Sequence, residues 1–567
     1  MVEPLDPSSL RTRRPNLRLL AVDASFLFRS KGLQIRRWLV DLLAGPPRLA
    51  KGAKADFPFV VGESTSPLYT VAGASERPLL LGKIQNLRLA CRRLDGLVLD
   101  PGRTFSFWRH VGPPWRLRGY VKGREVREGC VIPTTGGGLC QLSGSLLELA
   151  TGAGLDLLEH HRHTVLPADV PHHPERDATL FWNYVDLRFR SSAPLLIESH
   201  LTRDALVVRL RSKSPPTPDA VHERSGVNRF EAVMPPRSAA ESRTAYLLDE
   251  YRPELGTHLR ANVRLEDQVL IPFRTRGGQN WDSGLAGQVM EFPLFRIRRS
   301  LALRYAAARG RTVAKTHFRM AEALAVRYGR HLAFDAEHLC VAQPLLPYLW
   351  LAGLLGGRTV DVLMYRLPAA VLELELDVAS RLYSASRTLR EFRAPRWFVE
   401  AEANALRAAR QIVTPHAQIA ELFDNVVRLP WEVPAHPGDV GPDAPRDTLV
   451  FFGPTLARKG AYAVRDMIRQ TGLHLTLVGP DLEAADFWKG LPIDRQPAES
   501  LDWGRVHTVV QPALFEYWPR QLLRAHAAGA NLVISPGCGI PEDRSRGIRH
   551  VPFGDADRLA DAVRALL

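Results

Sequence analysis

Seven short runs of apolar residues, separated by segments of helical length, constrain the fold of this chain more than any other feature. Three of them occupy residues 338–343, 359–365 and 411–414, and four more occupy 448–453, 474–479, 506–511 and 531–535. Strands that are apolar along their whole length are typical of parallel sheets covered by helices, because neither face then meets water. The sequence therefore predicts an α/β protein with two parallel sheets.

A hinge rich in Pro and Gly over residues 433–447 separates the two series of runs. It predicts two Rossmann-like halves with a ligand cleft between them. We assign residues 229–432 to the first half and 448–567 to the second, which closes with a helix over 555–567. Residues 212–228 lose apolar side chains and gain Pro, Ser and charges, which indicates a linker before the first half.

The pattern before this linker is different and predicts a compact α+β domain over residues 78–211. We expect an amphipathic helix at 82–94 and a strand with a turn at 98–107. Residues 178–189 alternate like a strand with one buried face, and 206–210 would close the sheet.

Residues 1–77 form a basic amphipathic N-terminal segment. On a helix, Ile35, Trp38, Leu39 and Leu42 would share one face, with arginines beside it. Such a face either packs against its own domain or lies on an anionic membrane. The pattern leaves both interpretations open.

The formal charge of +15 comes mostly from arginine. It fits anionic partners, such as phospholipid or the phosphates of a nucleotide-sugar, and equally a solvated basic surface. No nucleic-acid-binding motif is found, so we expect no nucleic-acid partner.

The five cysteines are far apart and form no Cys-x-x-Cys pair, so their usage fits a reducing cytoplasm. The apolar patch at residues 19–28 is too short for a signal peptide, and no apolar stretch is long enough to span a bilayer. We expect a cytoplasmic protein, and the membrane-bound interpretation of the N-terminal helix would place it peripherally at the inner membrane face.

A glycine turn at residues 136–138 precedes Cys140, and a histidine cluster at 160–163 follows after one helix-length segment. Glycines permit a tight turn, and a helix start lowers the pKa of a thiol placed there. This order of residues predicts a thiol held at a helix start with a base close by.

Three interpretations of this cluster are open. Cys140 is a nucleophile, with His161 or His163 as general base and Asp177 orienting it. Alternatively, these four residues ligate a metal such as zinc, or Cys140 is a small buried residue with an inert thiol. Gln141, next to the thiol, either donates a hydrogen bond to an oxyanion or satisfies backbone groups at the helix start.

Several motifs in order resemble the VanW family, named for an accessory protein of vancomycin-resistance clusters. They occupy residues 82–87, 101–108, 119–120, 136–143, 153–155, 161–163 and 183–188. The resemblance implies that Cys140, Gln141 and His163 belong to a recurring site. It names a domain without naming a reaction.

Residues from about 301 onward resemble GT-B glycosyltransferases, most clearly from 448. Residues 452–460 look like the glycine loop whose basic residues bind the donor diphosphate. The resemblance implies donor contacts by Gly453 and Lys459. Pro454 stands at the position of the family's arginine, for which Arg458 would substitute.

Residues 515–530 resemble the loop and helix that carry two donor-binding glutamates in this family. Glu516 matches the first glutamate. Arg524 stands at the second, which usually contacts the nucleotide ribose, so the charge at that contact is reversed.

We therefore expect a bacterial fusion of a VanW-like domain with a glycosyltransferase-like module, acting in envelope or surface-glycan metabolism. It would transfer a sugar from a nucleotide-sugar, with an anionic lipid or lipid phosphate as acceptor. No cofactor other than the donor and no metal are expected. The alternatives are acyl transfer or hydrolysis at Cys140 and His163, and a non-catalytic binding scaffold.

Overall fold

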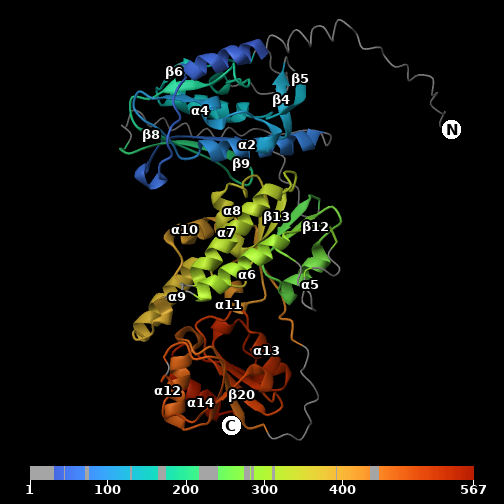
Figure 1. Ribbon diagram of the computed structural model, residues 1–567, viewed down its shortest axis with the longest axis vertical. Helices are drawn as coiled ribbons and strands as arrows, with labels where there is room; N and C mark the ends of the chain where they lie inside the picture. The colour runs from blue at the N-terminus through green and yellow to red at the C-terminus, as the bar shows by residue number, and fades with distance from the viewer. Residues whose placement is uncertain are drawn as a thin grey trace, which may run out of the picture. The chain divides into compact units, whose positions relative to one another are not determined.

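The computed structural model describes residues 31–43, 45–69, 76–127, 130–163, 174–215, 241–273, 281, 286–308, 313–390, 393–434, 446–484 and 486–567. The chain forms two compact units, Met1–Pro235 and Pro236–Leu567 (Figure 1). Each unit is described by itself. Most of the predicted linker and hinge lies outside the described residues.

The first unit is built on a four-stranded antiparallel sheet. Its order is β1 (Phe59–Pro67), β9 (Ala205–Ser212), β8 (Leu195–Leu201) and β2 (Leu97–Leu99). Helices α2 (Arg77–Leu94) and α4 (Cys140–Gly152) pack on these strands and close an apolar core. The unit also contains α3 (Phe107–Val111), the three-stranded sheet β3 (Thr104–Ser106), β7 (Arg188–Arg190), β6 (Asp156–Glu159), and the hairpin β4 (Lys122–Arg127), β5 (Cys130–Thr135). The predicted α+β class is confirmed.

Two details of the first unit differ from the sequence-based expectation. Strand β1 pairs with β9 along its length, so the folded unit includes residues before the predicted boundary at 78. The predicted strand over 178–189 is reduced to β7. Phe181 and Val185 instead pair across a tight turn in which Asn183 has a φ of 65°, a conformation that Asn adopts more readily than most residues.

The second unit contains two parallel sheets, as predicted. The first has the order β12 (Gln288–Glu291), β11 (Gln268–Ile271), β10 (Thr244–Leu247), β13 (His338–Ala342), β14 (Thr359–Leu363), β15 (Gln411–Thr414) and β16 (Val426–Arg428). Its helices are α5 (Pro253–Asn262), α6 (Pro293–Ala308), α7 (Val313–His331), α8 (Leu346–Leu351), α9 (Ala369–Leu382), α10 (Arg396–Arg407) and α11 (Ala417–Ala420).

The second sheet has the order β19 (Ile493–Gln496), β18 (Leu475–Val478), β17 (Thr448–Phe452), β20 (Val506–Gln511), β21 (Asn531–Ile534) and β22 (Ile548–His550). Helices α12 (Ala461–Thr471), α13 (Arg520–Ala527) and α14 (Ala556–Arg564) accompany it. Val450 and Phe452 of β17 enter one apolar cluster, while Leu449 and Phe451 enter another. Both faces of the sheet are therefore covered at β17, which explains the apolar run of this strand.

No helix within the described ranges is both long and apolar enough to cross a membrane.

Candidate functional site

The carboxyl ends of the parallel strands in the second unit surround a cleft of about 510 Å³. On the side of the first sheet, Asp249 follows β10 and Arg366 follows β14. On the side of the second sheet, Arg458 lies in the loop after β17 and Phe515 follows β20. Because ligands of open α/β sheets bind outside the carboxyl ends of the strands, this cleft has the location of a ligand site.

Three arginines line the cleft, and they come from both halves. Arg299 and Arg366 belong to the first half, and Arg458 belongs to the second. The Arg366 guanidinium lies 5.1 Å from the centre of the Tyr517 ring, and its buried Nε has no hydrogen-bond partner in the described part of the chain. Burial and the charge of Arg366 lower the pKa of Arg458. A buried cation with an unused donor is costly unless a ligand satisfies it, so the cleft is prepared for an anion.

Two carboxyl groups at the same cleft have opposite electrostatic environments. Burial, together with the charge of Glu250, raises the pKa of Asp249, whose Oδ2 accepts a hydrogen bond from the Tyr365 hydroxyl. Burial acts in the same sense on Glu250, but the ion pair with Arg299 lowers its pKa overall. Titratable neighbours whose environments push their pKa values apart are typical of acid–base sites.

The glycine loop predicted from the sequence joins β17 to α12. Gly460 has a φ of +86°, and a Cβ on it would lie 2.3 Å from the Pro512 carbonyl oxygen. Only glycine allows this approach to the end of β20. At the other end of the loop, the Gly453 N–H donates to the Val478 carbonyl at 2.8 Å.

Lys459 and Glu516, both expected to contact a donor, form a buried ion pair with each other. The other carboxylate oxygen of Glu516 accepts a hydrogen bond from the Trp518 N–H at 3.0 Å. The structure thus brings the Arg458–Lys459 loop and Glu516 together, since Lys459 and Glu516 are bonded and the neighbouring Arg458 faces the cleft.

Arg524 stands apart from this group. It lies on α13 with its guanidinium 4.7 Å from the centre of the Trp503 ring, and it does not line the cleft. Its expected contact with a ribose stays a prediction.

In the first unit, the glycine turn is packed tightly against α2. A Cβ on Gly138 would lie 2.1 Å from Lys83 Cγ, and the φ of Gly138 is +94°. The buried Asn86 amide donates to the Gly137 and Val121 carbonyls, both at 3.0 Å. Close approach and backbone conformation together require glycine here.

Lys83 is a candidate site residue that the sequence analysis missed. It is 7 % exposed, and its stem lies against Gly138. Burial and the charge of Arg124 lower its pKa to about 7. The available signal was a lysine on the helix face that carries Leu80 and Leu87, where a charge is costly.

Cys140 begins α4 as predicted, but the expected lowering of its pKa is wrong. Burial raises the pKa of this thiol to about 11, and the nearby carboxylates of Glu125 and Asp177 act in the same sense. Hydrogen bonds from the Leu180 backbone and the Thr179 side chain do not offset this. Desolvation outweighs the helix dipole, which contributes about 0.3–1 kcal/mol at an exposed site.

The structure brings His163 and Asp177 together. His163 Nδ1 lies 2.6 Å from Asp177 Oδ1, and the His163 backbone N–H donates to the same carboxylate at 3.1 Å. No hydrogen bond between His163 and Cys140 occurs within the described residues. His161 is exposed, with its Nε2 3.7 Å from Glu159 Oε1.

Gln141 uses its amide within the fold, because Nε2 donates to Ser66 Oγ and to the Pro67 carbonyl, both at 2.9 Å. As for a metal, the residues that the structure describes contain no group of three or more His, Cys, Asp or Glu arranged to hold one.

The first unit is similar to a known family. Residues 82–211 match the family described as VanW like protein. The vancomycin B-type resistance protein VanW of Enterococcus faecalis is 30% identical over 150 residues, which cover 26% of this chain and 54% of that protein. The uncharacterized protein YoaR of Bacillus subtilis is 33% identical over 129 residues, which cover 22% and 42%. The chain spans about half the length of these curated relatives. Residues 82–211 form a VanW-like domain, as the motifs predicted.

Solved structures of glycosyltransferases are similar to 57% of the chain. The apo form of the lipopolysaccharide outer core galactosyltransferase WaaB is 13% identical, with a TM-score of 0.33 and 90% of that chain covered. HepE of Anabaena in complex with UDP and glucose is 14% identical, with a TM-score of 0.32 and 89% covered. At such identities the likeness concerns the fold alone.

Proposed function

We propose that the second unit transfers a sugar from a nucleotide-sugar bound in its cleft. The observation that carries this proposal is the convergence of Arg299, Arg366 and Arg458 from both halves on one cavity, where the buried Arg366 Nε has no hydrogen-bond partner among the described residues. A diphosphate offers several acceptor oxygens and two negative charges, which guanidinium groups match in geometry and charge.

The buried pair of Lys459 and Glu516 supports the same proposal. On donor binding, Lys459 would exchange its carboxylate partner for a phosphate oxygen. Glu516 would then be free to accept hydrogen bonds from hydroxyl groups of the donor sugar. The pair keeps both side chains satisfied and in place beside the cleft, which lowers the entropy cost of ordering them.

Asp249 lines the cleft and is our candidate for the group that takes the proton of the attacking hydroxyl. The pKa of Asp249 is raised towards the neutral range, whereas Arg299 holds the pKa of Glu250 low. A general base works best when its pKa lies near the working pH. The hydroxyl oxygen would attack the anomeric carbon, its proton would pass to Asp249, and the nucleoside diphosphate would leave with the bonding electron pair.

An acceptor in the cell envelope is part of this proposal. It rests on the presence of a VanW-like domain in the same chain as the proposed transferase unit. A peptide or amide reaction at Cys140 is not favoured, because a thiol with a pKa of about 11 is almost fully protonated at neutral pH.

The test is release of free nucleoside diphosphate when the full chain is incubated with a panel of nucleotide-sugars. Slow transfer to water reports use of a donor even without the natural acceptor. We expect release from at least one donor. Arg366→Gln removes a charged hydrogen-bonding group and should therefore reduce kcat/KM about 10- to 100-fold. The matched control is Arg558→Gln, whose side chain is 72% exposed and remote from the cleft residues in sequence.

Asp249→Asn separates binding from chemistry. Loss of a general base should lower turnover about 10²- to 10⁴-fold while donor affinity stays unchanged. No release from any donor, or equal loss in Arg366→Gln and the control, would contradict the proposal.

A further inference from the structure

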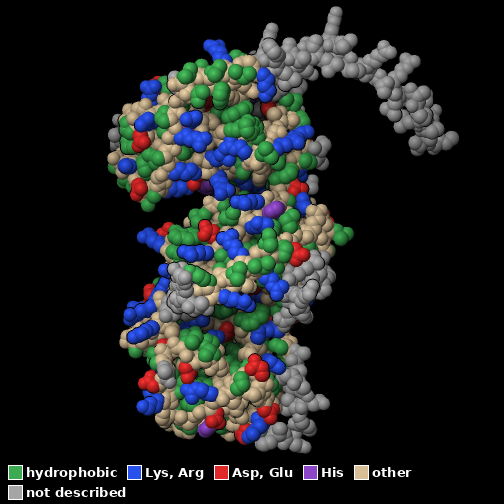
Figure 2. Space-filling view, viewed as in Figure 1, with side chains coloured by type: hydrophobic (Ala, Val, Ile, Leu, Met, Phe, Trp, Pro, Cys, Tyr) green, Lys and Arg blue, Asp and Glu red, His purple; other side chains and the backbone are tan. Residues whose placement is uncertain are grey.

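Residues 31–43 of the first unit form a helix whose apolar side chains face solvent. The exposed fractions are 60% for Ile35, 57% for Trp38, 66% for Leu42 and 87% for Leu43. Figure 1 draws this helix in the darkest blue, and Figure 2 shows hydrophobic side chains along the same edge of the first unit. The interpretation that this face packs against its own domain is therefore wrong for the described residues.

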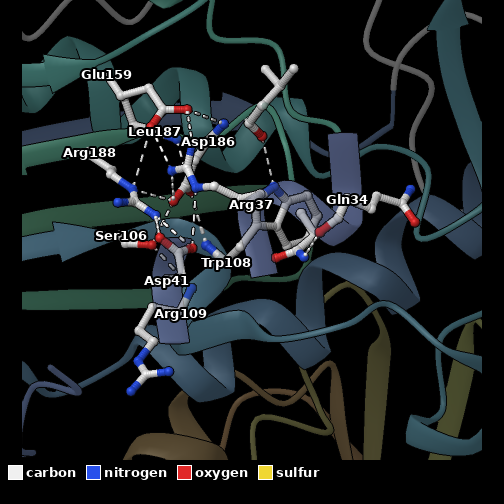
Figure 3. A network of polar contacts seen from close by, with 12 residues as sticks. Gln34, Arg37, Asp41, Ser106, Trp108, Arg109, Glu159, Asp186, Leu187 and Arg188 are labelled. Carbon is white, nitrogen blue, oxygen red and sulfur yellow. Dashed lines mark hydrogen bonds and ion pairs between the residues drawn. The ribbon is translucent and has the colours of Figure 1, made fainter. Parts of the chain in front are cut away.

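The opposite, polar side of the helix docks on the domain (Figure 3). Arg37 donates to both carboxylate oxygens of Glu159, at 2.7 and 3.2 Å. Arg188 Nη2 donates to both oxygens of Asp41 at 2.9 Å. In addition, the Asn183 amide donates to the Gln34 carbonyl at 2.9 Å.

The ion pairs between this helix and the domain form one network, in which arginines and carboxylates alternate and are partly buried. Arg37 also bonds Asp41 at 3.2 Å, and Arg188 bonds Asp186 at 2.9 Å. Each of the two cations forms ion pairs with the same three carboxylates, those of Asp41, Glu159 and Asp186. Asp186 in turn accepts hydrogen bonds from Ser106 Oγ at 2.6 Å and from the Trp108 N–H at 3.1 Å. Networks of this kind hold an orientation better than isolated surface pairs.

This helix is held to its domain by its polar face and exposes its apolar face to solvent. That arrangement is the reverse of the ordinary packing of an amphipathic helix on a domain. The exposed apolar side chains spread around the helix, since Leu33 and Val40 are 44% and 51% exposed as well. A narrow protein groove contacts one stripe, whereas a bilayer interface receives a broad apolar arc. The exposed side chains of Lys31 and Arg36 lie on the same helix, and the chain carries +15 overall.

We propose that residues 31–43 dock the protein on an anionic lipid bilayer. The apolar side chains enter the boundary of headgroups and acyl chains, and Lys31 and Arg36 contact the acidic headgroups. Trp38 suits this depth, because tryptophan favours the membrane–water interface. This surface lies in the first unit and does not depend on the proposed sugar transfer.

The test is co-sedimentation of the full chain with vesicles of phosphatidylglycerol, with phosphatidylcholine vesicles as the neutral counterpart. We expect binding to phosphatidylglycerol that weakens as salt rises, and much weaker binding to phosphatidylcholine. Leu43→Gln should reduce the partition coefficient about tenfold, since it removes one apolar side chain from the interface. Leu117→Gln is the matched control, because Leu117 is 98% exposed and lies outside this helix.

Each other outcome decides against the proposal. Absence of binding, equal binding to both lipids, or equal effects of Leu43→Gln and Leu117→Gln would overturn it. Light scattering of the chain without lipid tests the remaining alternative, in which a second copy of the chain covers this helix. A dimer that Leu43→Gln dissociates would assign this helix to self-association instead.

Discussion

Replacing Lys83 by methionine should stabilise the first unit at neutral pH. Burial and Arg124 lower the pKa of Lys83 from 10.5 to about 7. Lys83 therefore binds a proton more weakly in the folded state than in the unfolded state. At about 1.36 kcal/mol for each pKa unit, the charged lysine costs about 4–5 kcal/mol below pH 7. The cost falls away as pH rises from 7 towards 10.5. Methionine has a similar volume and no charge, and we expect a gain of about 2–4 kcal/mol after relaxation.

Hydrogen exchange of the α2 amides in the full chain measures this gain locally. Comparison of Lys83→Met with wild type at the same pH cancels the intrinsic exchange rate. Protection should increase about 30- to 1,000-fold near pH 6–7, with a smaller difference near pH 9. Lys122→Met is the control, because this exposed lysine lies on β4, the strand against which α2 packs. A destabilised Lys83→Met, or a gain independent of pH, would refute the reasoning.

Three further predictions concern single side chains. Asn86→Ala removes hydrogen bonds at the glycine turn and should cost about 2–4 kcal/mol in urea unfolding; a cost below about 1 kcal/mol would show that the turn does not depend on this amide. Iodoacetamide labelling of Cys140, followed by peptide mass spectrometry, should rise only towards pH 11, and a plateau by about pH 8 would contradict the raised pKa. Burial raises the pKa of Asp361, but His338 and Arg410 outweigh burial and lower this pKa overall. The ionised Asp361 therefore contributes stability above the ordinary pKa of 3.8, and this contribution is lost as pH falls through the lower pKa of the folded state. Asp361→Asn should therefore unfold about 2–4 kcal/mol more easily near pH 7, with a flatter acid limb, and an unchanged limb would count against this coupling.

The sequence predicted the parts of the fold that depend on continuous burial. Strands such as β13, β17 and β20 appear as apolar runs because both sheet faces are covered. Strands β10 and β11 were missed, although they have four residues each, the same length as β15, which was predicted. Arg366 could also have been predicted as a site residue, because a charged residue directly after a buried strand lies at the carboxyl end of that strand.

Other errors came from electrostatics and long-range contacts, which spacing does not encode. The position of Cys140 at a helix start was predictable, whereas its burial, which dominates its pKa, was not. The apolar face of residues 31–43 was also predictable, but its outward direction depends on Glu159 and Arg188, more than a hundred residues away. A lysine on the apolar face of α2 could be recognised from the sequence, whereas its packing against Gly138 was visible only once α2 and the turn were placed together.

Equilibrium binding of nucleotide-sugars to the full chain, measured by calorimetry, tests the central claim most directly. The cleft should bind at least one donor saturably, one molecule per chain. Lys459→Ala should weaken this binding about tenfold or more, as expected for a lost charged hydrogen bond, and Arg558→Gln should leave it unchanged. If no donor binds saturably, or if the affinity survives Lys459→Ala, the cleft is not a donor site.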